Sequence, residues 1–528
     1  MKHLILCADG TGNLGGTTPD SNVYRTYHLI DRHDPSQPQV VYYDNGVGTA
    51  VNTYWRAFTG AFGFGFKRNV LELYEFLARN YNPGDQGTPP DQIFLFGFSR
   101  GAAEVRALSG MIASAGLVDG RNLDKKSLDT KIKAAYRHYK KERPGLLFSS
   151  HGAIDLTFLG VWDTVSALGF PKYWRIAGIL SPVLNVLFHG LDWLCDKTIF
   201  AHNFYNYELT DNVKHAYQAL AIDDERLSFE PKIWNEPENE KTTVEQVWFA
   251  GAHSNVGGGY GRAGLSHIAL EWMLSKAKSQ GLKLKPEALK EVHSKANPHG
   301  RLYNERNGLG VFYRYYPRLI TDLWKEKNPA ESPIKIHRSV FERMARFSGN
   351  YAPGHLPSTF AVVSEDKPAK TVTINHPPWD ALQQQIQTWT KWRSYLYGAF
   401  LDVSLALVGV ALWLWGWAPD SVQKADMSKE EIGAVLHYLT KTLKYILPGM
   451  FDNLINLTFV QQPLYLVGAI LVVVVLFVAR WWVRRKYHEA CYALREILLD
   501  EFNQTPPSKF RGVSFDVVSG PPKEVIER

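Results

Sequence analysis

One stretch constrains the fold of this 528-residue chain most: an apolar run that passes through a glycine-flanked serine into a small-residue segment. QIFLFGFS (92–99) predicts a buried strand, and RGAAEVRALSGMIASAG (100–116) has the spacing and small side chains of a helix packed closely on a sheet. The junction GFSRG (97–101) matches G-x-S-x-G, which places a serine hydroxyl at a sharp strand-to-helix turn. Its glycines let the neighbouring chain pass where a Cβ would block it.

The first 260 residues repeat this alternation of short apolar runs and helical stretches. Such alternation is typical of a mostly parallel sheet covered by helices, so we predict an α/β fold of the α/β-hydrolase type for residues 1–375. The predicted strands are 3–10, 39–48, 92–99, 154–162, 215–222 and 244–251, and the predicted helices are 66–81, 100–116 and 265–279. Most of residues 261–395 is rich in Pro, Trp and Tyr without regular spacing, and yields no strand.

A serine hydroxyl is a poor nucleophile unless a base and an orienting acid accompany it. In this fold they follow the serine in the order acid, then histidine, each just beyond a strand. Asp163 follows the strand at 154–162, and His253 lies in the glycine-rich loop AGAHSNVGGGY after the strand at 244–251. We therefore predict a triad of Ser99, Asp163 and His253.

Some assignments in this site stay open. Asp155 and the pair Asp223 and Asp224 are rivals for the acid. The Arg100 backbone N–H, at the start of the predicted helix, is a candidate oxyanion donor. Gly10 and Thr11 of DGTGN are candidates for a second donor, with the loop DNGVGT (44–49) as their competitor.

Several other functions are disfavoured. The glycine-rich turns match neither G-x-G-x-x-G nor a P-loop, and no run of basic residues suggests nucleic-acid binding. Cys7, Cys195 and Cys491 lie far apart, so no disulfide framework or zinc site is predicted. The N-terminal apolar run is too short for a secretory signal. We predict no cofactor and no metal.

The C-terminal part changes character. Residues 396–417 carry one charge and residues 463–483 carry only an arginine near their end, and each is close to the ~20 residues that cross a bilayer. We predict a membrane module over 376–487 with a transmembrane hairpin at these two segments, followed by a cytoplasmic tail at 488–528. Flanking basic residues predict a multi-pass protein with both termini and the catalytic domain in the cytoplasm.

Two further segments could contact lipid. The apolar insertion at 174–210 is either a lid over the site or an extra pair of buried helices. The helix predicted at 430–447 carries its apolar residues on one face, which fits either a membrane surface or a partner protein. The net charge of +7 suits an anionic membrane surface.

Six segments together resemble a known family: CADGTGN, YYDNGVGT, FGFSRGA, FLGVWDTV, HAYQALAIDDER and WFAGAHSNVGGGY. In this order they are similar to the signatures of the DUF2235 family, the catalytic domain of type VI secretion lipase effectors of the Tle1 class. The resemblance covers roughly residues 1–375 and implies an α/β-hydrolase fold, phospholipase A-type ester hydrolysis, and the triad Ser99, Asp163 and His253. Asn255 and His267 depart from acidic residues usual in the family.

These observations predict a membrane-bound serine phospholipase of bacteria, located at the inner membrane, with glycerophospholipid as substrate and the bilayer as partner. An antibacterial toxin, a self-directed phage-defence effector and a housekeeping lipase all fit, as does a homo-oligomer or an immunity or regulatory partner. The alternatives are an esterase or thioesterase acting on soluble acyl substrates, and a membrane assembly or pore protein with an inert hydrolase domain.

Overall fold

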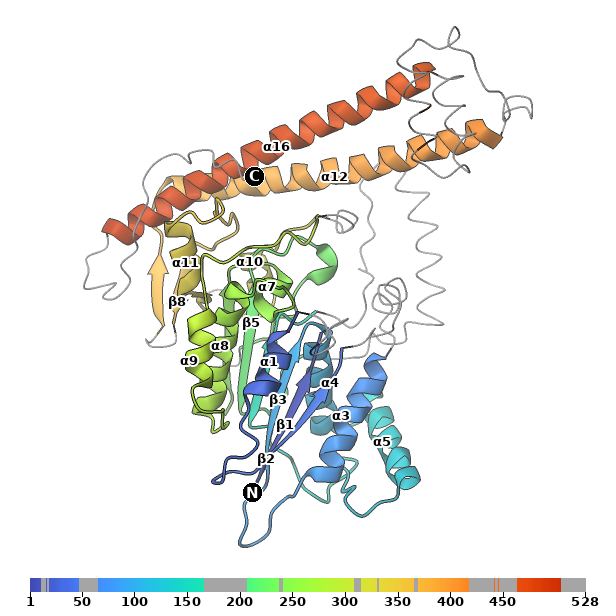
Figure 1. The fold of residues 1–528 in the computed structure, drawn as a ribbon, viewed down its shortest axis with the longest axis vertical. Coiled ribbons are helices and arrows are strands. Elements are labelled where there is room, and N and C mark those ends of the chain that lie inside the picture. The colour runs from blue at the N-terminus through green and yellow to red at the C-terminus, as the bar shows by residue number, and fades with distance from the viewer. Residues whose placement is uncertain are drawn as a thin grey trace. The chain divides into compact units, whose positions relative to one another are not determined.

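The computed structural model describes residues 1–10, 16, 19–46, 65–165, 207–236, 241–307, 315–329, 332–364, 369–416, 441, 445 and 463–504 (Figure 1). These residues fall into two compact units. The first unit holds the described residues before Gln385 and those from Cys491 onward. The second unit holds the described residues between Gln385 and Ala490.

The first unit is built on a nine-stranded sheet with the order β2-β1-β3-β4-β5-β6-β7-β8-β9. Neighbouring strands are parallel except β8 and β9, which are antiparallel. The strands are β1 His3–Ala8, β2 Gln39–Asp44, β3 Gln92–Phe98, β4 Phe158–Trp162, β5 His215–Ala221, β6 Thr243–Phe249, β7 Ile334–His337, β8 Thr359–Val363 and β9 Lys370–Thr373.

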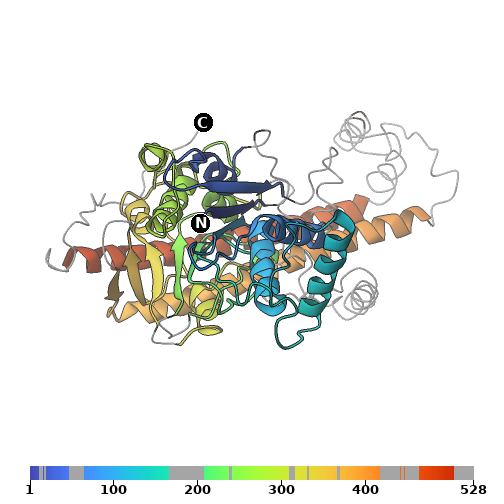
Figure 2. The same ribbon diagram turned by 90° about the horizontal axis from the view of Figure 1, so that it is seen from below.

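Helices cover both faces of this sheet (Figures 1 and 2). On one face, Leu4 and Leu6 of β1 belong to a core that also includes α3 Phe66–Asn80, α4 Arg100–Ala115 and α5 Lys125–Lys140. On the opposite face, Ile5 and Cys7 belong to a core that also includes α1 Asn22–Leu29, α8 Gly264–Ser279 and α9 Ala288–Lys295. Successive side chains of β1 point to opposite faces, and all of them are buried, as a strand that is covered on both faces requires. Shorter helices are α7 His253–Gly257, α10 Ile320–Lys325 and α11 Arg338–Ala345.

The mixed α/β fold with a mostly parallel, helix-flanked sheet is confirmed. Each strand predicted in the first 260 residues is present, and the three predicted helices are α3, α4 and α8. The insertion at 174–210 lies almost entirely outside the described residues. Apart from residues 441 and 445, so does the helix predicted at 430–447.

The second unit contains most of two long helices, α12 Pro378–Gly416 and α16 Pro463–Gln504. Within this unit the ring of Trp389 meets that of Trp482 edge-on at 5.3 Å, and the Arg393 guanidinium lies over Tyr487 at 4.6 Å. These contacts hold the two helices together.

The transmembrane hairpin predicted at 396–417 and 463–483 is not supported. In the described part of the chain, no helix combines the length and the apolar character that crossing a bilayer requires. The two apolar segments lie within longer helices, and α16 continues through the charged run Arg484, Arg485 and Lys486.

The end of α16 belongs to the first unit. Leu494 and Leu498 are buried there, and the Arg495 Nε donates to the Met344 carbonyl at 2.7 Å. The boundary predicted between 487 and 488 and the limit between the two units, after Ala490, both lie within α16, and residues 488–504 of the predicted tail are helical. Residues 505–528 lie outside the described residues.

Candidate active site

Ser99 lies at the turn between β3 and α4, with φ 58° and ψ −119°. An L-residue occupies this backbone region only under strain, and such strain collects at functional turns. A Cβ at Gly101 would lie 2.2 Å from the Ala8 carbonyl oxygen, and one at Gly97 would lie 2.6 Å from the Cα of Ala102. Both positions therefore require glycine, because α4 runs this close to β1 and to the end of β3.

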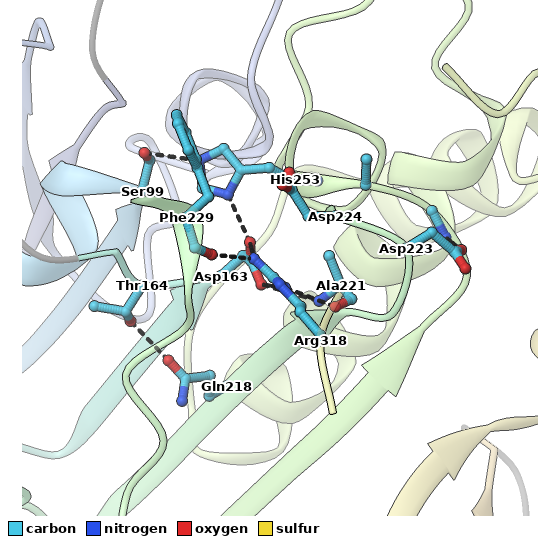
Figure 3. Close-up of polar contacts among 12 residues, drawn as sticks. Ser99, Asp163, Thr164, Gln218, Ala221, Asp223, Asp224, Phe229, His253 and Arg318 are labelled. Atoms are coloured by element: carbon cyan, nitrogen blue, oxygen red, sulfur yellow. Dashed lines mark hydrogen bonds and ion pairs between the residues drawn. The ribbon is translucent and has the colours of Figure 1, made fainter. Parts of the chain in front are cut away.

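The three residues of the predicted triad are hydrogen-bonded in series (Figure 3). The Nε2 of His253 lies 2.7 Å from the Oγ of Ser99, and its Nδ1 lies 2.6 Å from the Oδ2 of Asp163. All three side chains are buried. This arrangement is able to pass a proton from the serine hydroxyl to the imidazole while the carboxylate holds the ring.

Asp163 follows β4 directly and has a left-handed backbone, with φ 44°. Its Oδ1 accepts the Ala221 N–H at 2.9 Å, and the guanidinium of Arg318 contacts both carboxylate oxygens at 2.6 and 2.8 Å. Burial raises the pKa of the Asp163 carboxyl, but the charge of Arg318 and the hydrogen bonds from His253 and Arg318 hold that pKa below its usual range. Asp163 is therefore ionised.

The rival aspartates are engaged elsewhere. Asp155 is exposed and pairs with Lys214 at 2.8 Å. The Oδ2 of Asp223 accepts from the Gly251 N–H at 2.6 Å and from the Tyr351 hydroxyl at 2.9 Å. The carboxylate of Asp224 pairs with Arg226 at 2.6 Å and accepts the backbone N–H of His253 at 3.2 Å. None of these carboxylates contacts the imidazole of His253.

Apolar rings and an amide hold the histidine loop. The His253 ring lies 4.7 Å from that of Phe98 and 5.1 Å from that of Phe229, measured between centroids. Asn255 accepts the Tyr303 N–H at 3.2 Å and donates to the Arg301 carbonyl at 3.1 Å. An amide both donates and accepts, which an ionised carboxylate cannot do.

The predicted oxyanion donors differ in their surroundings. Arg100 is the first residue of α4, so its N–H lies at the helix N-terminus beside Ser99. The N–H of Gly10 donates to the Oδ1 of Asp9 at 2.6 Å and is thereby occupied. Thr11 and the second half of the competing loop at 44–49 lie outside the described residues. The catalytic and oxyanion roles stay predictions.

Arg318 and Phe229 were not predicted from the sequence. Arg318 lies in YYPRLI, within the irregularly spaced part of the chain, and its partners Asp163, Ala221 and Phe229 are distant in sequence. No local pattern could have identified it. Among the described residues, no group of three or more His, Cys, Asp or Glu side chains is arranged to hold a metal ion.

Fold and site together define a class: an α/β protein whose mostly parallel sheet carries a hydrogen-bonded serine, histidine and aspartate beyond the carboxyl ends of three strands. The family follows from comparison with known proteins. A model described as "T6SS, Phospholipase effector Tle1-like, catalytic domain" matches residues 2–276, and the chain belongs to this family.

The individual proteins that resemble this chain share a modest part of its sequence. The uncharacterized protein YEL023C of Saccharomyces cerevisiae is 31% identical over 198 residues, which are 32% of this chain and 27% of that protein. An uncharacterized protein from Pseudomonas aeruginosa is 18% identical in a structural match covering 87% of this chain and 64% of that chain, with a TM-score of 0.35. A Tle1 effector solved bound to the VgrG spike of the type 6 secretion system is 14% identical, covering 62% of this chain and 84% of that chain, with a TM-score of 0.33.

Proposed function

We propose that this protein is a membrane-associated phospholipase of type A, which hydrolyses acyl esters of glycerophospholipids with Ser99 as nucleophile. The observation that carries the proposal is the continuous hydrogen-bond chain from Ser99 through His253 to Asp163, at a serine held in a strained turn. Membership in a family of phospholipase effectors supports the choice of substrate.

The proposed reaction has two halves. Ser99 attacks the ester carbonyl while His253 takes its proton, and Asp163 orients the ring and stabilises its charged form. The Arg100 N–H at the start of α4 stabilises the oxyanion, and one such donor contributes about 3 kcal/mol to lowering the barrier. His253 then protonates the lysolipid leaving group, and water releases the fatty acid from Ser99.

The test uses defined phospholipids and mass spectrometry of their products. Wild-type protein should release fatty acid and lysolipid, and Ser99→Ala should release neither. Ser109→Ala is the matched control, because Ser109 is a buried serine further along α4 that donates to the Arg106 carbonyl. Normal turnover by Ser99→Ala would refute the assignment of the nucleophile. Cleavage of a short-chain nitrophenyl ester, with none of micellar phospholipid, would indicate a soluble-substrate esterase.

The membrane contact in this proposal is a surface contact through α16. Among the side chains of this helix that the structure describes, ten large apolar ones are exposed, from 37% for Val473 to 70% for Phe477. They are Ile470, Leu471, Val472, Val473, Val474, Val475, Phe477, Val478, Trp481 and Trp482. Such a patch is unusual on a surface facing water, and the basic residues that follow it suit anionic lipid. We place this contact at the cytoplasmic side of the bacterial inner membrane.

Vesicle flotation tests the contact. Wild-type protein should float with vesicles that contain anionic phospholipid, and Val475→Asp with Phe477→Asp should reduce the floating fraction several-fold. Ala493→Ser, a charge-neutral change at an exposed position of the same helix, should leave it unchanged. Undiminished flotation of the double variant would remove α16 from the proposal.

The family also supports an effector role, in which lipid hydrolysis damages a bacterial membrane. Induced expression in a bacterial host should arrest growth, and Ser99→Ala should relieve the arrest. Arrest that persists at equal expression of Ser99→Ala would favour a membrane-disrupting protein whose hydrolase domain is inert.

A further inference from the structure

Arg318 is the buried cation of the candidate site. Its Nη1 and Nη2 form a fork onto the two oxygens of Asp163, and its side chain is 3% exposed. The same nitrogens donate to the carbonyls of Ala221 and Phe229, each at 2.6 Å. An arginine that bonds to a carboxylate through both nitrogens fixes its plane as well as its position. Arg318 therefore fixes Asp163 relative to the end of β5 and to the segment that carries Phe229.

The guanidinium and the imidazole share one carboxylate oxygen. The Oδ2 of Asp163 lies 2.6 Å from the Nδ1 of His253 and 2.8 Å from the Nη2 of Arg318 (Figure 3). These two distances place the nitrogens no more than 5.4 Å apart, a range at which charges interact strongly in a buried site. A positive charge so close to the ring partly offsets the negative charge that Asp163 presents to it.

The other charged groups described near His253 have partners of their own. Asp224 accepts the backbone N–H of His253 and is paired with Arg226, which also lies 3.7 Å from Glu305. The ring neighbours Phe98 and Phe229 are uncharged, and Asp223 faces Gly251 and Tyr351. Asp163 and Arg318 form a second neutral pair. Loss of Arg318 alone would leave an uncompensated negative charge on the carboxylate that contacts the imidazole.

We propose that Arg318 is a positioning residue for the hydrolytic reaction: it orients Asp163 and offsets the charge that this carboxylate presents to the imidazole, and through both effects it sets the pH range in which the enzyme works. The inference rests on the proposed function, since it gives His253 the role of general base. Because Arg318 acts through Asp163, it requires no contact with the substrate.

The size of the effect follows from the separation of the charges. Replacing Arg318 with an uncharged side chain should move the acid limb of the activity profile to higher pH by about one to two pH units. Arg318→Lys retains the charge but not the fork, so it should move the acid limb less while lowering the rate on the plateau.

The experiment follows the rate at which a fluorophosphonate probe labels Ser99, across pH, in the full-length wild type, Arg318→Gln and Arg318→Lys. Arg495→Lys is the matched control, because Arg495 is also buried and donates to the Met344 and Ala345 carbonyls, away from the triad. We expect the acid limb to move upward in Arg318→Gln, less in Arg318→Lys, and not at all in Arg495→Lys. Thermal melting of each variant separates a change in profile from a loss of fold.

Two results would overturn the inference. One is an unchanged acid limb in Arg318→Gln, with labelling reduced by the same factor at every pH, as a purely structural role predicts. If Arg318→Gln does not fold, Arg318→Lys decides: a plateau rate equal to that of wild type would contradict positioning by the fork. Wild-type protein that is labelled at Ser99 but cleaves no phospholipid would overturn the proposed function and leave this inference standing.

Discussion

The strained turn at Ser99 makes a prediction that does not depend on catalysis. Alanine and glycine at this position both remove the hydroxyl and its bond to His253, but they differ in how they tolerate φ 58° and ψ −119°. An L-residue held in such a region costs about 1–3 kcal/mol, whereas glycine enters it at little cost. Ser99→Gly should therefore be more stable than Ser99→Ala.

The expected difference is smaller than the strain itself. Glycine also gives the unfolded chain more freedom, which lowers stability by about 0.5–1 kcal/mol. The net advantage of Ser99→Gly over Ser99→Ala is therefore about 1 kcal/mol. In a unit of this size, 1 kcal/mol corresponds to a shift of about 2 °C in Tm.

Paired thermal melts and urea unfolding of the two variants measure this difference. Ser109 supplies the control, because it lies within α4, where glycine is less favourable than alanine by about 1 kcal/mol. The order should thus reverse: glycine is the more stable substitution at Ser99 and the less stable one at Ser109. If Ser99→Ala proves as stable as Ser99→Gly while the Ser109 pair behaves as expected, the reasoning about backbone strain is wrong.

Three further predictions concern buried groups around the site. Asp163→Asn should lower the free energy of unfolding by about 3 kcal/mol or more, seen in urea titration, because it leaves the Arg318 guanidinium buried without its carboxylate. Burial raises the pKa of Asp223 from 3.8 to about 6, so its stabilising contribution is complete at low pH and is lost as the pH rises through 6. Asp223→Asn should thus gain Tm relative to wild type between pH 4 and 7, and a constant difference would contradict this. Gly101→Ala brings a Cβ within 2.2 Å of the Ala8 carbonyl oxygen and should cost about 1–3 kcal/mol in thermal unfolding while slowing probe labelling of Ser99.

The part of the fold that the sequence predicts well is the part with long apolar runs. β3 is buried along nearly its whole length and reads as an uninterrupted apolar strand. β7 and β9 have only four residues each, and in both an apolar side chain alternates with polar ones. Such short, mixed segments give too weak a periodic signal to separate strand from loop. β7 and β9 therefore became visible only in the structure.

The residues of the candidate site also differ in how far the sequence alone reveals them. Ser99 and His253 stand in glycine-rich segments whose local sequence is itself the signal. Arg318 acquires its place only through Asp163, Ala221 and Phe229, which are 155, 97 and 89 positions away. A buried ion pair between segments so distant leaves no pattern in a single sequence.

Sheet order explains why spacing alone could not select the acid. β5 lies between β4 and β6 and ends at the same edge, so Asp223 and Asp224 stand in strand order closer to His253 than Asp163 does. Their carboxylates bind main chain instead: Asp223 accepts the Gly251 N–H, and Asp224 accepts the N–H of His253 itself. Of these three aspartates, only Asp163 has a carboxylate that is hydrogen-bonded to the imidazole of His253. The aspartates after β5 thus fix the backbone of the histidine loop, whereas the aspartate after β4 fixes the imidazole. Because His253 follows β6 and Ser99 follows β3, the imidazole extends past the end of β5 to reach the serine.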